Sequence, residues 1–293
     1  MLGGHSECLT VPESTFKINV PRRMGLDALD SNNTRILFNA ILDDWRLRVW
    51  GLDVEQLRRE SVQVGLPYSQ AIEQLVCRYA ERMGESPARY WVDHTPQNRR
   101  DGIQLLQLFP GAPVIHVVRD GRAVTASMIA KDGGPNTVRS AATKWQEAIA
   151  DGLALESWLG QEKVMRVRYE DLVTQPKETL GRLCAFLNLD FQQEMVTGEG
   201  YRVPEYDQAY HGRIGKQPDA SRINAWQKVL SRREVEIFEW SAGHLLQYLG
   251  YSLQNGWPGR GPTPTETARM MGVEAFRSIV NKFRKRKRRW LTT

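Results

Sequence analysis

Apolar residues occur along this chain in two patterns, short continuous runs and longer stretches at helical spacing. Runs typical of buried strands end at Val11 and lie at residues 90–93, 114–118 and 163–169. Helical spacing predicts helices over residues 32–50, 69–83, 97–108, 137–159, 177–187, 232–249 and 266–285. Because strands alternate with helices, we expect an α/β fold with βαβ units around a mostly parallel sheet.

The remaining segments define the expected domain organisation. The apolar residues of 32–50 fall on one predicted helix face, namely Ile36, Leu37, Ala40, Ile41 and Trp45. Segment 190–228 has neither pattern and is rich in Gly, Pro, Tyr and Arg, which predicts a long loop of the kind that often carries function. We expect one domain over 1–253, a linker over 254–265 and a basic amphipathic helix over 266–293.

The positive charge of the chain is concentrated at its C-terminal end. The formal net charge is +6, and seven basic residues lie between Lys282 and Arg289, so the rest is close to neutral. An amphipathic helix ahead of such a run suits an anionic membrane surface, through residues 276–290, better than a nucleic acid groove. A solvated surface helix is an equally open interpretation.

The cysteines indicate neither disulfides nor a metal site. Cys8, Cys77 and Cys184 are far apart, odd in number and without a CxxC pair, so we expect reduced core thiols. No apolar stretch approaches the roughly 18 residues of a membrane span, and the first residues have no signal-peptide pattern. These features predict a cytoplasmic protein, with membrane-peripheral attachment as the alternative.

Four polar residues follow predicted strands: Glu13, His94, Arg119 and Tyr169. Ligands of parallel sheets bind beyond the carboxyl ends of the strands, so this recurrence indicates a functional edge. After the run 114–118, Arg119 precedes a helix whose free N–H groups would complete an anion site. Ser127 follows about two helical turns later and could face the same anion. An arginine that forms a salt bridge at a strand end is the alternative.

These segments, in this order, resemble sulfotransferases that use 3′-phosphoadenosine-5′-phosphosulfate (PAPS), and most of all the tyrosylprotein sulfotransferases and their bacterial relatives. The resemblance rests on Arg119 to Ser127, on Lys144-Trp145, on Arg168 to Leu172 and on the helix from Pro176 to Leu189. It implies a P-loop-NTPase-like three-layer fold, PAPS as sulfuryl donor and no metal.

The resemblance also implies roles for single residues. Glu13 matches the catalytic general base, and His94 falls where the family usually has lysine, so it could stabilise charge only when protonated. Asn224 falls where the tyrosylprotein branch has a catalytic serine. Residues expected on the nucleotide are Arg119, Ser127, Lys131, Tyr169 and Arg222. A histidine that is merely hydrogen-bonded at a strand end is an equally open interpretation of His94.

The chain departs from the family at its start. Residues 1–5 match the helix that follows the family's phosphosulfate-binding loop, and the first strand and that loop are not found. We expect either a start placed too late, which could also hide a targeting segment, or a relative that has lost half its cofactor site. The first is favoured, and chain 1–293 is then expected to be inactive or poorly soluble. A non-catalytic nucleotide- or partner-binding protein is the alternative function. The acceptor (protein tyrosine, carbohydrate or small metabolite) and a homodimeric state are left open.

Overall fold

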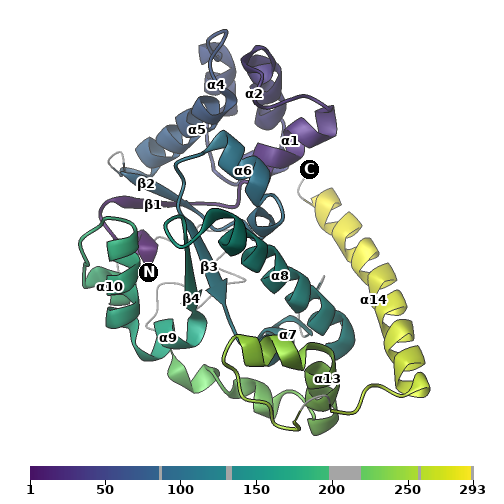
Figure 1. Cartoon of the computed structure of the whole chain (residues 1–293). Coiled ribbons are helices and arrows are strands. Elements are labelled where there is room, and N and C mark those ends of the chain that lie inside the picture. Colours follow the sequence, from purple (N-terminus) through teal and green to yellow (C-terminus); the bar gives the residue numbers. More distant parts are fainter. Residues whose placement is uncertain (86–87, 130–133, 198–218, 257–258, 292–293) are drawn as a thin grey trace. The chain divides into compact units, whose positions relative to one another are not determined.

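The computed structural model describes residues 1–85, 88–129, 134–197, 219–256 and 259–291, with side chains described up to residue 281 (Figure 1). The chain divides into two compact units of interleaved segments. The first unit holds Met1–Ile115, Leu155–Met165 and Gln175–Pro218. The second unit holds His116–Ala154, Arg166–Thr174 and Asp219–Thr293.

A parallel strand pair and a set of helices form the first unit. Strand β1 (Cys8–Val11) pairs in parallel with β2 (Tyr90–Asp93), and Val11 lies opposite Asp93. Its helices are η1 (Leu2–Gly4), α1 (Phe16–Met24), η2 (Ser31–Asn33), α2 (Thr34–Leu42), α3 (Trp45–Arg48), α4 (Val54–Glu60), α5 (Tyr68–Met83), η3 (Pro96–Arg99), α6 (Gly102–Leu108), α10 (Pro176–Phe186) and α11 (Glu194–Thr197). The core is built around Trp50, whose ring packs at 5.6 Å from that of Phe16 and 5.3 Å from that of Tyr79.

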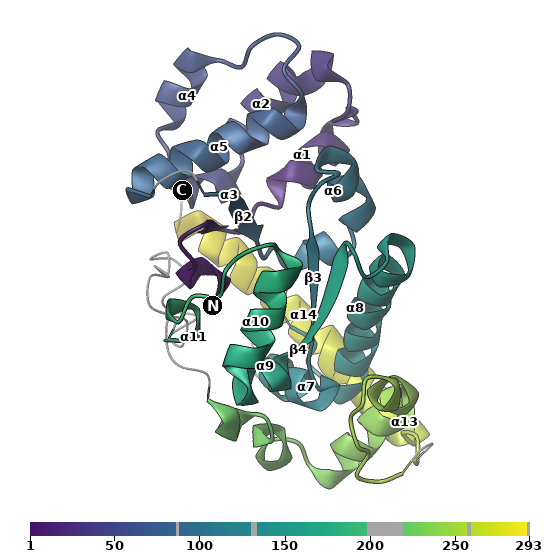
Figure 2. The same ribbon diagram turned by 60° about the vertical axis from the view of Figure 1, so that its left-hand side comes forward.

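The second unit has its own hydrophobic core. Strands β3 (Val114–Val118) and β4 (Val164–Arg168) lie side by side and pair with one another (Figure 2). The first two residues of each strand are assigned to the first unit. The other elements are α7 (Gly121–Ile129), α8 (Val138–Leu159), α9 (Tyr169–Thr174), η4 (Ala220–Arg222), η5 (Ala225–Lys228), α13 (Arg232–Tyr248) and α14 (Pro264–Leu291). Val118, Trp145 and Phe238 are at the centre of this core, with ring centroids of the two aromatics 5.7 Å apart.

The predicted strands and the helices at 69–83, 137–159, 177–187 and 232–249 are confirmed to within a few residues. The continuous helix over 32–50 is wrong. It ends at Leu42, and the Asp44 carboxylate accepts a hydrogen bond from Arg46 N (3.0 Å), which caps a separate helix α3. Trp45, on α3, is 59% exposed and Ile36, on α2, is 50% exposed, although the apolar pattern placed both on one face with Leu37 and Ile41.

Other expectations are corrected as well. The helix over 97–108 is two elements, because a 3-10 turn that begins at Pro96 is followed by a new helix at Gly102. Cys8 and Cys184 are buried as expected, but Cys77 is exposed, because it lies on the solvent side of α5. Of the predicted loop 190–228, residues 198–218 lie outside the described part, and α11, η4 and η5 account for much of the rest. Within the described residues, none of the helices is both long and apolar enough to span a membrane.

Candidate functional site

Glu13 and His94 follow the same ends of two neighbouring strands. Because β1 and β2 are parallel and Val11 lies opposite Asp93, the chain leaves both strands at one edge of the sheet. His94 is exposed, and Glu13 is partly buried with 27% of its side chain accessible. Both expected residues of the first unit therefore lie at the predicted edge.

A buried polar network joins the two loops that carry these residues. Ser14 N donates to Thr95 Oγ1 (2.8 Å), and Lys17 Nζ donates to Ser14 Oγ (2.6 Å) and forms an ion pair with Asp93. The Asp93 carboxylate also accepts from Thr95 N (3.0 Å), Thr95 Oγ1 (2.6 Å) and Asn98 Nδ2 (2.9 Å). The Asp93 carboxylate and the Lys17 ammonium thus fix the backbone next to both Glu13 and His94.

The ionisation of Asp93 follows from these contacts. Burial would raise the pKa of the Asp93 carboxyl, but the adjacent Lys17 ammonium and the hydrogen bonds from Thr95 and Asn98 outweigh burial and lower it. The carboxylate therefore remains charged at neutral pH. Lys17 is almost completely buried, so its ammonium depends on this partner.

Arg46 contacts Glu13 directly, and the sequence patterns did not predict this. Arg46 Nη1 lies 2.7 Å from Glu13 Oε2, and the guanidinium carbon lies 4.2 Å from the centroid of the Trp45 ring. Glu13 does not cap the helix that follows it, since α1 has Thr15 at its N-cap and no side-chain capping bond. Arg46 is brought to Glu13 by the turn between α2 and α3, which helical periodicity had placed inside one helix.

In the second unit, Arg119 and Tyr169 lie against one another. The guanidinium carbon of Arg119 is 4.3 Å from the centroid of the Tyr169 ring, and Trp145 Nε1 donates to Arg119 O (3.1 Å). Arg119 Nε is buried and has no hydrogen-bond partner among the residues that the structure describes. A buried donor without a partner carries a free-energy penalty that an anion next to the guanidinium would remove.

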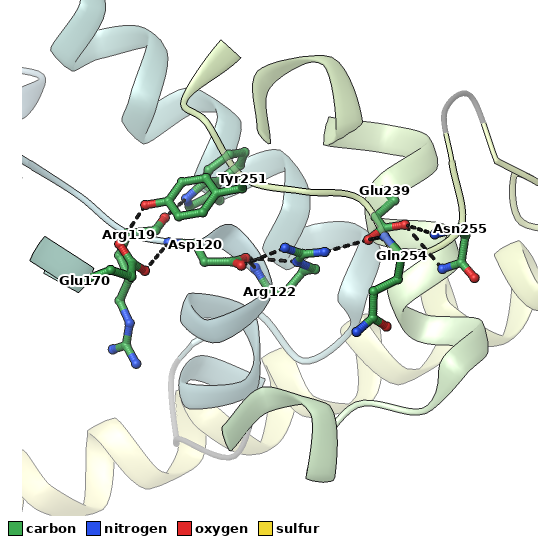
Figure 3. Close-up of polar contacts among 9 residues, drawn as sticks. Arg119, Asp120, Arg122, Glu170, Glu239, Tyr251, Gln254 and Asn255 are labelled. Atoms are coloured by element: carbon green, nitrogen blue, oxygen red, sulfur yellow. Dashed lines mark hydrogen bonds and ion pairs between the residues drawn. The ribbon is translucent and has the colours of Figure 1, made fainter. Parts of the chain in front are cut away.

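The residues after Arg119 are fixed by a buried ion network (Figure 3). Arg122 donates to Asp120 through Nε (3.0 Å) and Nη2 (2.8 Å) and to Glu239 through Nη1 (2.6 Å). Glu239 also accepts from the backbone N–H groups of Gln254 and Asn255, both at 2.9 Å. Burial would lower the pKa of Arg122, but the two carboxylates outweigh burial and raise it. This network joins the start of α7 to α13.

Glu170 connects the same strand end to Tyr251, three residues after the end of α13. Asp120 N donates to Glu170 Oε1 (3.0 Å), and Tyr251 Oη donates to Glu170 Oε2 (2.8 Å). Burial and the negative charge of Glu170 raise the pKa of the Tyr251 hydroxyl, so it remains a donor at any physiological pH. The backbone at Arg119 and Asp120 is thereby held from both sides.

The other expected residues of the second unit are near this strand end or outside the described part. Ser127 is exposed on α7, and Asn224 is exposed at the N-cap of η5 without a capping bond. Element η5 packs on α7 through Trp226, whose ring centroid lies 4.4 Å from the guanidinium carbon of Arg122. Arg222 lies in η4, which contacts α9, the helix that begins with Tyr169. Lys131 lies outside the described residues.

Comparison with known proteins agrees with the resemblance that the sequence indicated. A family model described as the sulfotransferase family matches residues 1–193. The chain is 28% identical to protein-tyrosine sulfotransferase A of Caenorhabditis elegans over 201 residues, which cover 63% of this chain and 52% of that protein. It is 28% identical to protein-tyrosine sulfotransferase 2 of Gallus gallus over 134 residues, which cover 44% of this chain and 36% of that protein. The chain thus spans about half or less of the length of these relatives.

A solved structure shares the fold. The sulfotransferase domain of the Synechococcus olefin synthase superposes with a TM-score of 0.59 at 20% identity, over 86% of this chain and 89% of that one. This likeness supports an α/β fold with parallel strands flanked by helices, as expected from the alternation of strands and helices.

Proposed function

Because the chain belongs to the sulfotransferase family, whose model matches residues 1–193, we propose that it transfers a sulfuryl group from PAPS to an acceptor hydroxyl, with Glu13 as general base. The observation that carries the proposal is the parallel register of β1 and β2, which brings Glu13 and His94 to one sheet edge. A carboxylate beside a potential cation is what proton removal from a hydroxyl and stabilisation of the resulting charge require.

The second unit fits a phosphorylated nucleotide. Arg119 has a buried Nε without a partner, and its guanidinium is oriented by the ring of Tyr169. We assign Arg119 as the principal phosphate ligand, with Ser127, Lys131 and Arg222 as further contacts and Tyr169 beside the nucleotide. When bound, PAPS supplies an activated sulfuryl group and an adenosine bisphosphate leaving group that keeps the electron pair of the broken S–O bond.

The remaining chemistry is performed by side chains of this chain. Glu13 accepts the proton of the acceptor hydroxyl on a carboxylate oxygen, and Arg46, 2.7 Å from Oε2, orients that carboxylate. His94 in its protonated form, and Asn224 through its amide N–H, stabilise the negative charge that develops on oxygen. No residue in these roles is a metal ligand. The acceptor class stays open, and the names of the two relatives favour a tyrosine side chain.

The test measures transfer of labelled sulfate from PAPS to a tyrosine peptide, a carbohydrate and a small phenol by the full chain. Glu13→Gln should abolish transfer, because the amide cannot accept the proton. Glu7→Gln is the matched control, since Glu7 precedes the same strand and its side chain is 47% exposed. Transfer that persists in Glu13→Gln, or that is lost equally in Glu7→Gln, would contradict the assignment.

A non-catalytic nucleotide-binding relative is the second candidate. The ion pair between Arg46 and Glu13 favours it, because the carboxylate needed as base already has a cationic partner. This candidate predicts that adenosine bisphosphate binds, that Arg119→Ala abolishes binding, and that the chain transfers no sulfate to any of the three acceptors. Sulfate transfer that depends on Glu13 would exclude it.

A further inference from the structure

One face of α14 is held against the second unit. The Glu274 carboxylate accepts from Asn136 N (2.8 Å), Asn136 Nδ2 (2.9 Å) and Thr137 Oγ1 (3.0 Å), and also contacts Ser140 Oγ. Met270, one turn earlier on the same face, packs on the core of this unit. At the start of the helix, Glu266 forms an ion pair with Arg233 (2.8 Å). These contacts fix which side of α14 faces its own unit.

The opposite face of α14 is apolar and exposed. Phe276 and Ile279 have 67% and 56% of their surface accessible. The exposed small residue Gly272 lies on the same side, one turn before Phe276. An exposed apolar strip of this kind on a helix that is anchored by its other face marks an interaction surface. We define the α14 strip as Phe276 and Ile279.

The charge of the chain identifies the chemistry of the partner. The backbone of α14 remains helical to Leu291, and seven of the eight residues from Lys282 to Arg289 are basic. By helical spacing, Phe283 and Trp290 continue the line of Phe276 and Ile279. Apolar residues in line with a dense basic run match the boundary between acyl chains and anionic headgroups.

We propose that α14 binds the surface of an anionic phospholipid bilayer, with the α14 strip in the acyl–headgroup boundary and the basic run on the headgroups. Nucleic acid would also attract the basic run, but it offers no apolar layer for the strip. A bilayer uses both features. The proposal is independent of sulfate transfer, because no residue of α14 has a role in the proposed chemistry.

The test is co-sedimentation of the full chain with vesicles of equal parts phosphatidylcholine and phosphatidylglycerol, and with vesicles of phosphatidylcholine alone. We expect binding to the anionic vesicles that weakens as salt is added, and at least about tenfold weaker binding to the neutral ones. Phe276→Gln with Ile279→Gln should weaken anionic binding about tenfold or more. The matched control is Val64→Gln, since Val64 is 82% exposed in the first unit.

The contribution of the basic run is tested by replacing Arg284, Lys285 and Arg286 with glutamine. The control is glutamine at three exposed arginines of the first unit, Arg35, Arg59 and Arg100. Unchanged circular dichroism and melting temperature establish that the variants fold. Three outcomes overturn the proposal. One is vesicle binding that does not respond to the Phe276 and Ile279 changes. Another is stronger binding to a DNA duplex than to the anionic vesicles, again with no effect of the Phe276 and Ile279 changes. This outcome would assign the basic run to nucleic acid. The third is self-association, measured by light scattering, that requires the α14 strip and occurs without vesicle binding. This outcome would assign the strip to contact with a second copy of the chain.

Discussion

Lys17 in the first unit and Arg122 in the second are buried cations held by carboxylates. Lys17 has 1% of its surface accessible and pairs with Asp93, and Arg122 has 4% accessible and pairs with Asp120 and Glu239. A buried ion pair adds little net stability, but removal of one partner leaves the other charge buried and alone. These pairs therefore specify the loop geometry beside Glu13 and Arg119 more than they stabilise the fold.

Asp93→Asn should destabilise the protein by about 3–5 kcal/mol, because the Lys17 ammonium would remain buried without its counter-charge. Adding Lys17→Met should recover a large part of that loss, since the double variant removes both charges. Urea unfolding of the wild type, both single variants and the double variant measures the coupling. Additive losses, with no recovery in the double variant, would show that the Lys17 ammonium is not held by Asp93.

The residue scale also separates what the sequence could predict from what it could not. Glu13, His94, Arg119 and Tyr169 were predicted because each follows a strand, and strand ends are visible in local patterns. Arg46, although it contacts Glu13, carries no local signal of this role. Its contact with Glu13 depends on the turn at Asp44 between α2 and α3. The spacing of apolar residues does not predict this turn.

At the scale of elements, some helices could be predicted from the sequence and others could not. The helices α5, α8 and α13 were predicted because their buried residues recur at helical spacing over many turns. The prediction of one helix over 32–50 was wrong because Trp45 continues the helical spacing of Leu37 and Ile41. The helix nevertheless ends at Leu42, between Ile41 and Trp45. One capping carboxylate outweighs the continuity of the apolar pattern there.

The start of α7 packs tightly enough to require glycine. A Cβ on Gly121 would lie 2.4 Å from Phe238 Cζ and 2.6 Å from Trp145 Cδ2, and both rings are buried. Gly121→Ala should therefore cost about 1–3 kcal/mol through displaced rings. Gly181→Ala in α10 is the control, because nothing lies within 4 Å of its Cβ, and it should be neutral or stabilise by up to about 1 kcal/mol. Equal melting temperatures for the two variants would contradict this packing.

The Glu274 carboxylate of α14 accepts hydrogen bonds from Asn136 and Thr137, the two residues before α8, and this contact depends on pH. Partial burial raises the pKa of Glu274, but hydrogen bonds from Ser140, Asn136 and Thr137 outweigh it and lower the pKa to about 2. Because the pKa is lower in the folded state, the stabilisation is fully present above the unfolded pKa of about 4.3 and is lost as pH falls through 2.

Glu274→Gln should therefore lower the free energy of unfolding by about 1 kcal/mol at pH 7, the usual net contribution of a hydrogen bond. The difference from wild type should shrink between about pH 4 and pH 2, where the wild-type carboxylate becomes protonated. Urea unfolding across that range measures it, and Glu73→Gln on the exposed side of α5 is the control. A difference that stays constant down to pH 2 would show that the charge of Glu274 does not contribute.

At the scale of the whole molecule, segments from both units are interleaved along the chain, so each unit depends on contacts between residues far apart in sequence. Each unit has a separate core, and each contains part of the proposed chemistry, with Glu13 and His94 in the first and Arg119 and Tyr169 in the second. A ligand of Arg119 should therefore stabilise the full chain through the second unit, whether or not the chain transfers sulfate.

Adenosine 3′,5′-bisphosphate at about a hundred times its dissociation constant should stabilise the nucleotide-binding unit by about 2.7 kcal/mol. This gain should raise the melting temperature and slow amide exchange in α7 and α9, the two helices that follow β3 and β4. Arg119→Ala should lose both effects, because the Arg119 guanidinium is the proposed phosphate ligand. Arg139→Ala, an exposed arginine of α8 in the same unit, should keep them, and Glu13→Gln should keep them too because the base does not hold the product. If Arg119→Ala were stabilised as much as Arg139→Ala, the nucleotide would have to bind elsewhere, and the unpartnered Nε of Arg119 would be a structural feature of the strand end alone.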